Sequence, residues 1–429
     1  MRKYNLYKKS TFEWMGEIPS HWILTKNRYG FQKYNNGKNE SDETPVLSLT
    51  TKGVKVKTNL SFGKSTESYV GHQIVNKGDI VFTPRDFDQT PILSDVSNFY
   101  GCISNLYIVD KTKEGVLNHF VNYYWYGLKY SVDYFKNFSH GMRYSFNRFQ
   151  FDEIPLILPP VSEQEQIVSF LDTKTSLIDS LIEKTRRKIE LLKEKKTSLI
   201  NEVVTKGLNP NVEIKDSGVE WIKEIPSHWM VSKLKYDSST PVQYGINISG
   251  DKYVEEGIRF IRITDIRESG DLNPNDGKYL VPGDVPNEFL LQKFDILFCR
   301  SGHTVGKSYL HTSDGLFSSG GYLVRFNFRN YTESKFIFYL SKTHFYWDWI
   351  NINTVVSTIE NVNGDKYQNF IYPKPPLSEQ NEIVSYLDEQ TQLIDKTISI
   401  EEKRIELLRE YRQSLISEVV TGKIDVRVN

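Results

Sequence analysis

The sequence has little of what several common classes of site require. Only two of its 429 residues are cysteines, Cys102 and Cys299, and neither has metal-ligand spacing around it. We therefore expect no metal site and no disulfide framework. No apolar run approaches the roughly 18 residues that span a bilayer, and the first residues lack the apolar core of a signal peptide. We expect a cytoplasmic protein without a membrane partner.

An excess of charge is missing too. Lys+Arg and Asp+Glu each number 54, so the formal net charge is zero. A protein that holds DNA unaided usually carries a basic excess, because neutralising phosphates supplies most non-specific affinity. Composition alone thus does not indicate DNA, and a DNA-binding protein of this charge is expected to bind weakly without partners.

Two blocks of sequence occur twice, which is the most informative feature of the chain. STFEWMGEIPSHW (10–22) returns at 217–229 as SGVEWIKEIPSHW. A block beginning PPVSEQEQIVSFLD (159–205) returns at 375–421 with 27 of 47 positions identical. The segments between these blocks show little obvious identity. The repeated parts must do one job twice, and the divergent parts must do two different jobs.

The longer repeated block has the pattern of a long helix. Pro159-Pro160 disfavours helix upstream, and Ser162 with Glu165 has capping-box spacing. Apolar residues then recur every seven positions among charged ones, which predicts a coiled coil. Gly207 and Gly422 are predicted helix stops. The predicted packing stripe is Ile178, Ile182, Ile189, Leu192, Leu199 and Val203 in the first copy and Ile394, Ile398, Ile405, Leu408, Leu415 and Val419 in the second.

Two such helices could bury their stripes against each other and act as a spacer. One copy of the stripe is long enough to exceed a turn of B-DNA, roughly 34–36 Å. The alternative is an ordinary helical hairpin core with no measuring role. Three charged residues interrupt the stripe, Lys196, Glu401 and Arg412. They are expected either at its edge or facing partner subunits.

The divergent segments, about 30–158 and 237–374, are predicted to be mixed α/β globules. Short β-type runs alternate with Gly/Asn/Asp/Ser turns, and helices are expected near 118–130 and 332–350. The expected domains are a first recognition domain (1–158), a central helix (159–207), a linker with a second recognition domain (208–374) and a C-terminal helix with a tail (375–429).

The motifs resemble those of one known family. KDSGVEWIKEIPSHW (215–229) leads into the second divergent segment, PPxSEQxxIVxxLD opens each repeated helix and SLIxEVVT closes it. FDILFCRSGHTVGKS (294–308) and its weaker counterpart GDIVFTPRDFD (78–88) add to the match. In their order and spacing these elements resemble the specificity subunits of type I restriction–modification systems, over essentially the whole chain.

The resemblance implies a concrete organisation. Two α/β target-recognition domains would be separated by two conserved helices that form an antiparallel coiled-coil spacer with a pseudo-twofold repeat. Each domain would bind one half of a split, double-stranded DNA target. The helices would dock two methyltransferase subunits, which methylate adenine with S-adenosylmethionine. ATP-dependent restriction and translocase subunits would join them.

Catalytic motifs are missing from the chain itself. There is no Asn/Asp-Pro-Pro-aromatic motif of an amino-methyltransferase and no GxGxxG between a strand and a helix. SGHTVGKS (301–308) resembles a phosphate-binding loop but lacks its first glycine, and a strand is predicted after it. We expect no catalytic residue and no cofactor. A fused enzyme would need a further catalytic domain, whereas a docking scaffold or antirestriction decoy is the alternative left open.

Polar residues in turns of the divergent segments are the candidate DNA contacts. Arg or Lys can fork to guanine and Asn or Gln to adenine, while Lys and Arg also position phosphates. For any single residue a solvated loop position is the simpler interpretation. The candidates in the first segment are Lys52, Lys55, Lys57, Arg85, Arg143, Tyr144, Asn147 and Arg148. Those in the second are Gln243, Tyr244, Asn247, Arg262, Arg300, Ser301, His303, Lys307 and Lys366. His21 and His228, in the repeated IPSHW turn, are predicted packing residues.

Overall fold

The computed structural model divides the chain into two compact units. Unit 1 comprises Met1–Arg186 with Glu402–Asn429, and unit 2 comprises Arg187–Glu401. Two long helices, α5 (Val161–Lys206) and α10 (Leu377–Val420), continue from one unit into the other. The structure describes residues 2–12, 15–32, 36–58, 68–85, 92–132, 134–137, 145, 147–354 and 361–427.

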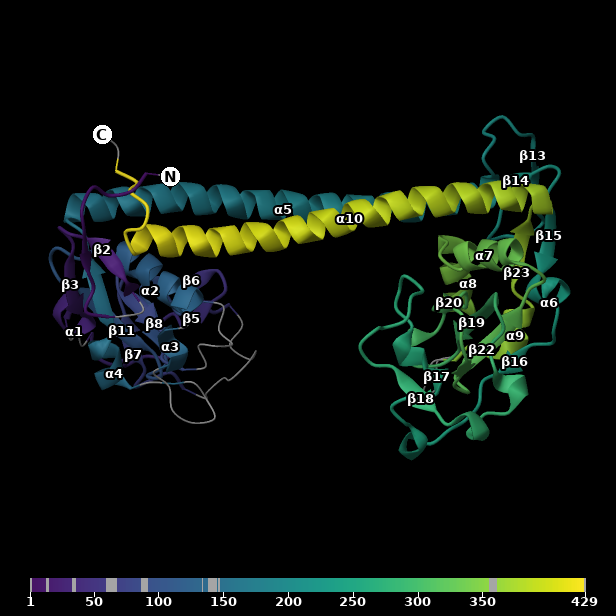
Figure 1. The fold of residues 1–429 in the computed structure, drawn as a ribbon, viewed down its shortest axis with the longest axis horizontal. Coiled ribbons are helices and arrows are strands. Elements are labelled where there is room, and N and C mark those ends of the chain that lie inside the picture. Colours follow the sequence, from purple (N-terminus) through teal and green to yellow (C-terminus); the bar gives the residue numbers. More distant parts are fainter. Residues whose placement is uncertain are drawn as a thin grey trace. The chain divides into compact units, whose positions relative to one another are not determined.

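Unit 1 is a mixed α/β globule joined to parts of both long helices (Figure 1). Its strands are β1 (Tyr7–Lys9), β2 (Glu17–Pro19), β3 (Ile23–Lys26), β4 (Phe31–Gln32), β5 (Leu47–Thr50), β6 (Gly53–Val56), β7 (Gln73–Val75), β8 (Ile80–Phe82), β9 (Ser94–Val96), β10 (Gly101–Ile103), β11 (Ile108–Thr112) and β12 (Pro155–Leu158). Its shorter helices are α1 (Asn27–Gly30), α2 (Asn118–Val132), α3 (Tyr134–Asn137) and α4 (Arg148–Glu153).

Unit 2 repeats this organisation. Its strands are β13 (Ile214–Asp216), β14 (Glu224–Pro226), β15 (Met230–Lys233), β16 (Gln243–Tyr244), β17 (Ile258–Ile261), β18 (Lys278–Leu280), β19 (Asp295–Cys299), β20 (Ser308–Leu310), β21 (Phe317–Ser319), β22 (Leu323–Asn327) and β23 (Ile371–Lys374). Its shorter helices are α6 (Leu234–Asp237), α7 (Tyr331–Leu340), α8 (His344–Asn353) and α9 (Gly364–Gln368).

The same sheet lies at the centre of each unit. In unit 1 the four antiparallel strands have the order β4-β11-β8-β9, and in unit 2 the order is β16-β22-β19-β20. The strand that enters each globule pairs with the one that leaves it, β3 with β12 and β15 with β23. The predicted mixed α/β fold with an internal repeat is therefore confirmed.

Each unit encloses its own apolar core. In unit 2, Phe298 and Phe326 of the sheet share one core with Phe336 of α7 and with Val204 and Leu387 of the long helices. The end of α5 and the start of α10 are thus part of the core of the unit 2 globule. Among the described residues, no helix is long and apolar enough to cross a membrane.

The long helices begin two residues earlier than the capping-box pattern predicts. They start at Val161 and Leu377, so Ser162 and Ser378 lie inside the first turn. The amides of Glu163 and Gln164 bond instead to the carbonyl oxygen of Pro160. The predicted stops are confirmed, because Gly207 directly follows α5 and Gly422 lies two residues after the last residue of α10, with φ values of 76° and 75°. Glycine adopts this conformation without strain.

Candidate DNA-recognition interface

The start of each long helix is fastened to the repeated IPSHW turn by one glutamate. In unit 1, Glu163 accepts hydrogen bonds from the indole nitrogen of Trp22 (3.0 Å) and from Tyr4, and His21 Nε2 lies 2.8 Å from it. In unit 2, Glu379 accepts from Trp229 (2.9 Å), and His228 Nε2 lies 2.8 Å away.

The end of the other long helix lies at the same turn. Gly207, which follows α5, lies against Trp229 and Glu379. Gly422, which follows α10, lies against Pro19 and Trp22. In each unit the start of one helix therefore adjoins the end of the other, which makes the pair antiparallel. The two histidines, predicted to be packing residues, are exposed and bond the glutamate at the helix start.

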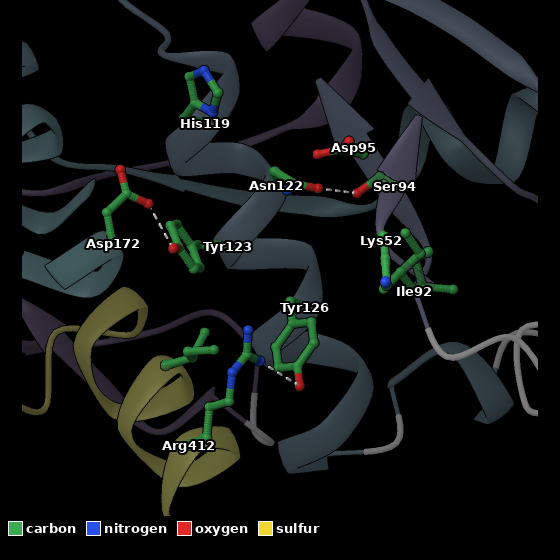
Figure 2. A pocket seen from close by; sticks show the side chains of 13 residues that line it. Lys52, Ile92, Ser94, Asp95, His119, Asn122, Tyr123, Tyr126, Asp172 and Arg412 are labelled. Atoms are coloured by element: carbon green, nitrogen blue, oxygen red, sulfur yellow. Dashed lines mark hydrogen bonds between the residues drawn. The ribbon is translucent and has the colours of Figure 1, made fainter. Parts of the chain in front are cut away.

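A second anchor joins each globule to the helix pair. Tyr123 of α2 donates to Asp172 (2.7 Å), and Tyr339 of α7 donates to Asp388. Tyr339 follows Tyr123 at the same distance in sequence at which residue 375 follows residue 159, where the two copies of the long helical block begin. We call this spacing the repeat offset. In unit 1 the anchor borders a cleft of about 280 Å³, where Arg412 also bonds a second tyrosine of α2 (2.9 Å; Figure 2).

The charged residues that interrupt the stripe form ion pairs between the helices. In unit 2, Lys196 Nζ lies 2.6 Å from Asp395, and Lys188 Nζ lies 2.5 Å from the buried Glu401. In unit 1, Arg412 Nε lies 3.1 Å from Asp179, the counterpart of the Lys196 pair. Lys196 and Arg412 are partly exposed and thus lie at the edge of the stripe, one of the two expected positions, whereas Glu401 is buried.

The predicted stripe residues differ in burial. Leu192, Leu199 and Leu408 are partly exposed. The buried members are Ile178, Ile182, Ile189, Val203, Ile394, Ile398, Ile405, Leu415 and Val419.

Strand ends in unit 2 bring together many of the candidate DNA contacts. Arg300, directly after β19, donates its backbone amide to Tyr322, directly before β22 (3.0 Å). In the same loop, the amide of Gly320 donates to the carbonyl oxygen of Ile261, at the end of β17. The amide of Gly321 donates to the carbonyl oxygen of Ile246, beyond β16. We call the candidates that these bonds place at one edge the unit 2 edge: Tyr244, Asn247, Arg262, Arg300, Ser301 and His303.

Members of the unit 2 edge differ in exposure. Asn247 and His303 are exposed, whereas Ser301 is buried and bridges to Asn361. Tyr244 is 42% exposed, and its hydroxyl accepts a hydrogen bond from the amide of Gly364. Tyr322, 58% exposed at the same edge, was missed by the sequence analysis because an isolated tyrosine carries no motif.

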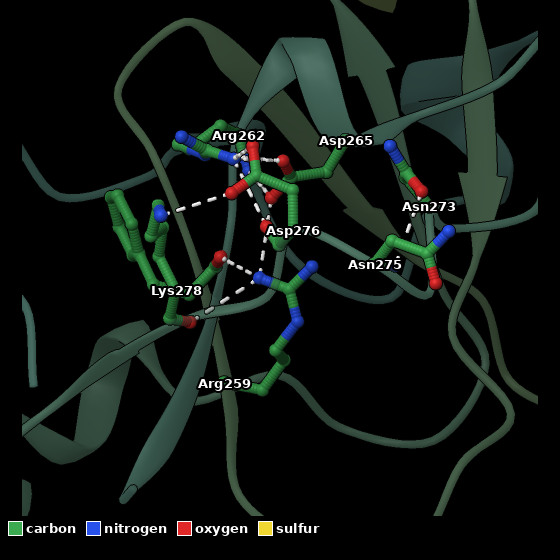
Figure 3. Close-up of polar contacts among 8 residues, drawn as sticks. Arg259, Arg262, Asp265, Asn273, Asn275, Asp276 and Lys278 are labelled. Atoms are coloured by element: carbon green, nitrogen blue, oxygen red, sulfur yellow. Dashed lines mark hydrogen bonds and ion pairs between the residues drawn. The ribbon is translucent and has the colours of Figure 1, made fainter. Parts of the chain in front are cut away.

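Arg262 belongs to an ion-pair network (Figure 3). Its guanidinium bonds Asp265 (2.6 Å) and Asp276 (2.9 Å), and Lys278 also pairs with Asp276 (2.9 Å). Hydrogen bonds from Lys278 and then from Arg262 lower the pKa of Asp276 to about 2. Arg262 is therefore neutralised within the protein, which leaves little free charge for a phosphate.

The remaining candidates of unit 2 also have internal partners. Lys307 Nζ lies 2.7 Å from Glu268, and Lys366 Nζ donates to the carbonyl oxygen of Asn353. Gln243 is partly buried and pairs with Arg325 in the central sheet.

The described candidates of unit 1 also fall into two groups, those that are exposed and those that have partners within the protein. Lys52 lies in the turn between β5 and β6, and Lys55 and Arg85 are exposed. Lys57 is partly exposed just beyond β6. Arg143 and Tyr144 lie outside the described residues.

Two further candidates of unit 1 take part in internal contacts. Asn147 caps α4 by accepting the amide of Gln150 (3.0 Å). Arg148 bonds Asp110 (2.7 Å) and Asp152 (2.9 Å). Burial raises the pKa of Asp110 to about 6, although Arg148 opposes the rise. Arg148 thus holds α4 against β11.

The repeat extends into the divergent segments, where the sequence analysis found little identity. Asp79 and Asp295, separated by the repeat offset, each accept an amide hydrogen bond at 2.7 Å in the turn before the central strand. Asn363 caps α9 as Asn147 caps α4, again at the repeat offset. The bridge between Arg85 and Ser145 likewise corresponds to that between Ser301 and Asn361.

Comparison with known proteins agrees with this organisation. The family model described as the type I restriction modification DNA specificity domain matches residues 7–191 and 248–410. The type I restriction enzyme MjaVIII specificity subunit of Methanocaldococcus jannaschii is 25% identical over 439 residues, covering 98% of this chain and 97% of that protein. The EcoBI specificity subunit of Escherichia coli is 22% identical over 49% of this chain and 43% of that protein.

Solved structures share the fold. A chain from a study of complex assembly and conformational transition of the type I R-M system superposes with a TM-score of 0.71 at 15% identity, covering 95% of this chain and 99% of that one. The HsdS subunit of Thermoanaerobacter tengcongensis gives 0.56 at 16% identity, covering 97% of this chain and 100% of that one. The chain thus belongs to the type I restriction–modification DNA specificity family and is a specificity subunit, a protein of DNA sequence recognition.

Proposed function

We propose that this subunit recognises a two-part, gapped DNA target, with one half-site bound by each unit. The observation that carries the proposal is the structural duplication. Both units share the central sheet, the glutamate anchor and the tyrosine anchor. The side chains at corresponding edge positions nevertheless differ, as Arg85 and Ser301 do. Two units with the same fold but different side chains at their edges are suited to bind two half-sites of different sequence.

The helix pair offers a matched docking surface for two identical partners. Leu177 and Leu393 are 55% and 59% exposed, and Leu191 and Leu407 are 49% and 53% exposed. Both pairs are separated by the repeat offset, and each unit carries one leucine from each helix. Larger exposed apolar patches mark protein contacts, and the support here is that the exposed leucines recur at the same offset in both copies. We assign them to two methyltransferase subunits, which restriction and translocase subunits then join.

The chemistry is assigned to those partners. Among the described residues, no group of three or more His, Cys, Asp or Glu side chains could hold a metal ion. Cys102 and Cys299 are buried and unpaired, which suits a reducing cytoplasm. The subunit would supply sequence recognition alone, while adenine methylation and ATP-driven translocation belong to the other subunits.

Mapping methylated adenines tests the proposal directly. The chain is co-expressed with its cognate methyltransferase subunit in a methylation-free host, and modified adenines are located by long-read sequencing. We expect a two-part, gapped motif that disappears when this chain is omitted. Stable co-purification without new methylation would contradict the proposal and favour the scaffold or decoy function.

Substituting the exposed leucines should weaken partner binding without harming the fold. Leu177→Asp with Leu393→Asp places a carboxylate on each assigned docking surface, and we expect at least about tenfold weaker binding of the methyltransferase subunit. Ser176→Asp is the matched control, because this exposed residue precedes Leu177 but faces about 100° around the helix. Titration calorimetry measures both. Equal binding by the double variant and the wild type would refute the assignment.

A further inference from the structure

Arg300 differs from the other candidate cations in how it is held. Its Nε donates to the carbonyl oxygen of Gly321 (3.0 Å). Its Cζ lies 5.1 Å from the ring centre of Tyr244 and 5.8 Å from that of Tyr322. Both distances are within the range of cation–π attraction. One backbone bond and two rings therefore fix the direction of a side chain that would otherwise be mobile.

The outer end of this guanidinium is unused within the described part of the chain. No described residue bonds its two terminal nitrogens or forms an ion pair with Arg300. Arg262 and Lys307, by contrast, are neutralised by carboxylates. Arg300 thus combines a fixed orientation with two free donors.

Such a fork matches one base. Guanine presents O6 and N7 side by side in the major groove, and an arginine can donate to both at once. A lysine can also donate to guanine, but its compact ammonium lacks the rigid planar fork of arginine and is not equivalent at such a site. Holding the side chain beforehand lowers the entropy lost on binding, because fewer rotamers must be frozen.

We propose that Arg300 is a specificity-determining residue that recognises a guanine in the half-site bound by unit 2. The inference rests on the proposed function and names one base pair of the target. In unit 1 the repeat offset places Pro84 where unit 2 has Arg300, so this arginine has no counterpart at that position. The guanine contact is thus specific to one half-site.

The test co-expresses the full subunit with its methyltransferase and compares the methylated sites produced by the wild type with those produced by each variant. Arg300→Lys keeps the charge but loses the fork. We expect the preference for guanine at one position of one half-site to fall by about 5- to 150-fold, with the other half-site unchanged. Arg329→Lys is the matched control, because Arg329 is exposed beyond the opposite end of β22. It should leave the motif intact.

A second variant guards against misfolding. Tyr322 is 58% exposed, so Tyr322→Leu should fold, and we expect it to relax the same position more weakly. Melting temperatures of all variants are compared with the wild type. A half-site without a G·C pair, an unchanged motif in both variants, or uniform loss of methylation at every site would overturn the inference; the last is the signature of a phosphate contact. Failure of the wild type to give any gapped motif would instead refute the proposed function.

Discussion

Lengthening both long helices by one heptad should widen the gap between the half-sites and leave both half-sites unchanged. α5 and α10 have 46 and 44 residues and continue from one unit into the other. Seven residues add about 10.5 Å to a helix. That length corresponds to a gap up to about three base pairs longer. A heptad keeps the stripe facing its partner helix.

The boundary between the units is the place for the insertion. Duplicating 180–186 in α5 and 402–408 in α10 adds sequence at the ends of stretches that belong to unit 1. The anchors at Glu163, Glu379, Asp172 and Asp388 lie well away from both sites and should survive. Three base pairs also turn B-DNA by about 100°, so we expect slower methylation at the longer gap.

Mapping of methylated adenines measures the gap. Insertion in α5 alone is the control, because it would shift one stripe against the other and break pairs such as Lys196–Asp395. That variant should lose assembly altogether. If the double insertion changed a half-site and kept the gap, the division of labour between globules and helices would be wrong.

What could be predicted from the sequence depended on whether a feature is local. The helices follow from heptads within one segment, and Gly207 and Gly422 follow from their place beside those helices. The duplication could be predicted because the two copies of each repeated block share many identical residues. In the divergent segments the repeat survives in single residues, such as Asp79 and Asp295, which no pattern distinguishes.

The roles of charged residues were harder to predict, because their partners are distant in sequence. Arg148 bonds Asp110, 38 residues earlier, and Lys196 pairs with Asp395, 199 residues later. From the sequence, Arg148 and Arg300 look alike. Only the folded arrangement separates an arginine that holds two elements together from one whose outer nitrogens are free among the described residues.

Replacing Glu163 by alanine should destabilise unit 1 by about 3 kcal/mol, because two buried donors lose their acceptor. The side chain of Glu163 is only 5% exposed, and it accepts from Tyr4 and Trp22, which are themselves buried. Water cannot readily replace it there. The carboxylate also lies in the first turn of α5, where the helix dipole favours negative charge.

The repeat supplies a matched comparison for this prediction. Glu379 makes the corresponding bonds to Trp229 and His228, but its side chain is 22% exposed, so water can take over part of its role. Glu379→Ala should therefore cost unit 2 less, about 1–2 kcal/mol. Glu165→Ala, at an exposed position two residues away, should change stability by no more than about 0.5 kcal/mol.

Hydrogen exchange under mild denaturant reports each unit separately, because amides of β12 belong to unit 1 and those of β23 to unit 2. Glu163→Ala should speed exchange in β12 by roughly 150-fold, the equivalent of about 3 kcal/mol, with a smaller change in β23. Glu163→Gln retains one acceptor oxygen and should lose only part of the stability. If the two alanine variants were equally destabilising, burial would not govern the strength of this anchor, and the difference would have to be sought in the partners of each glutamate.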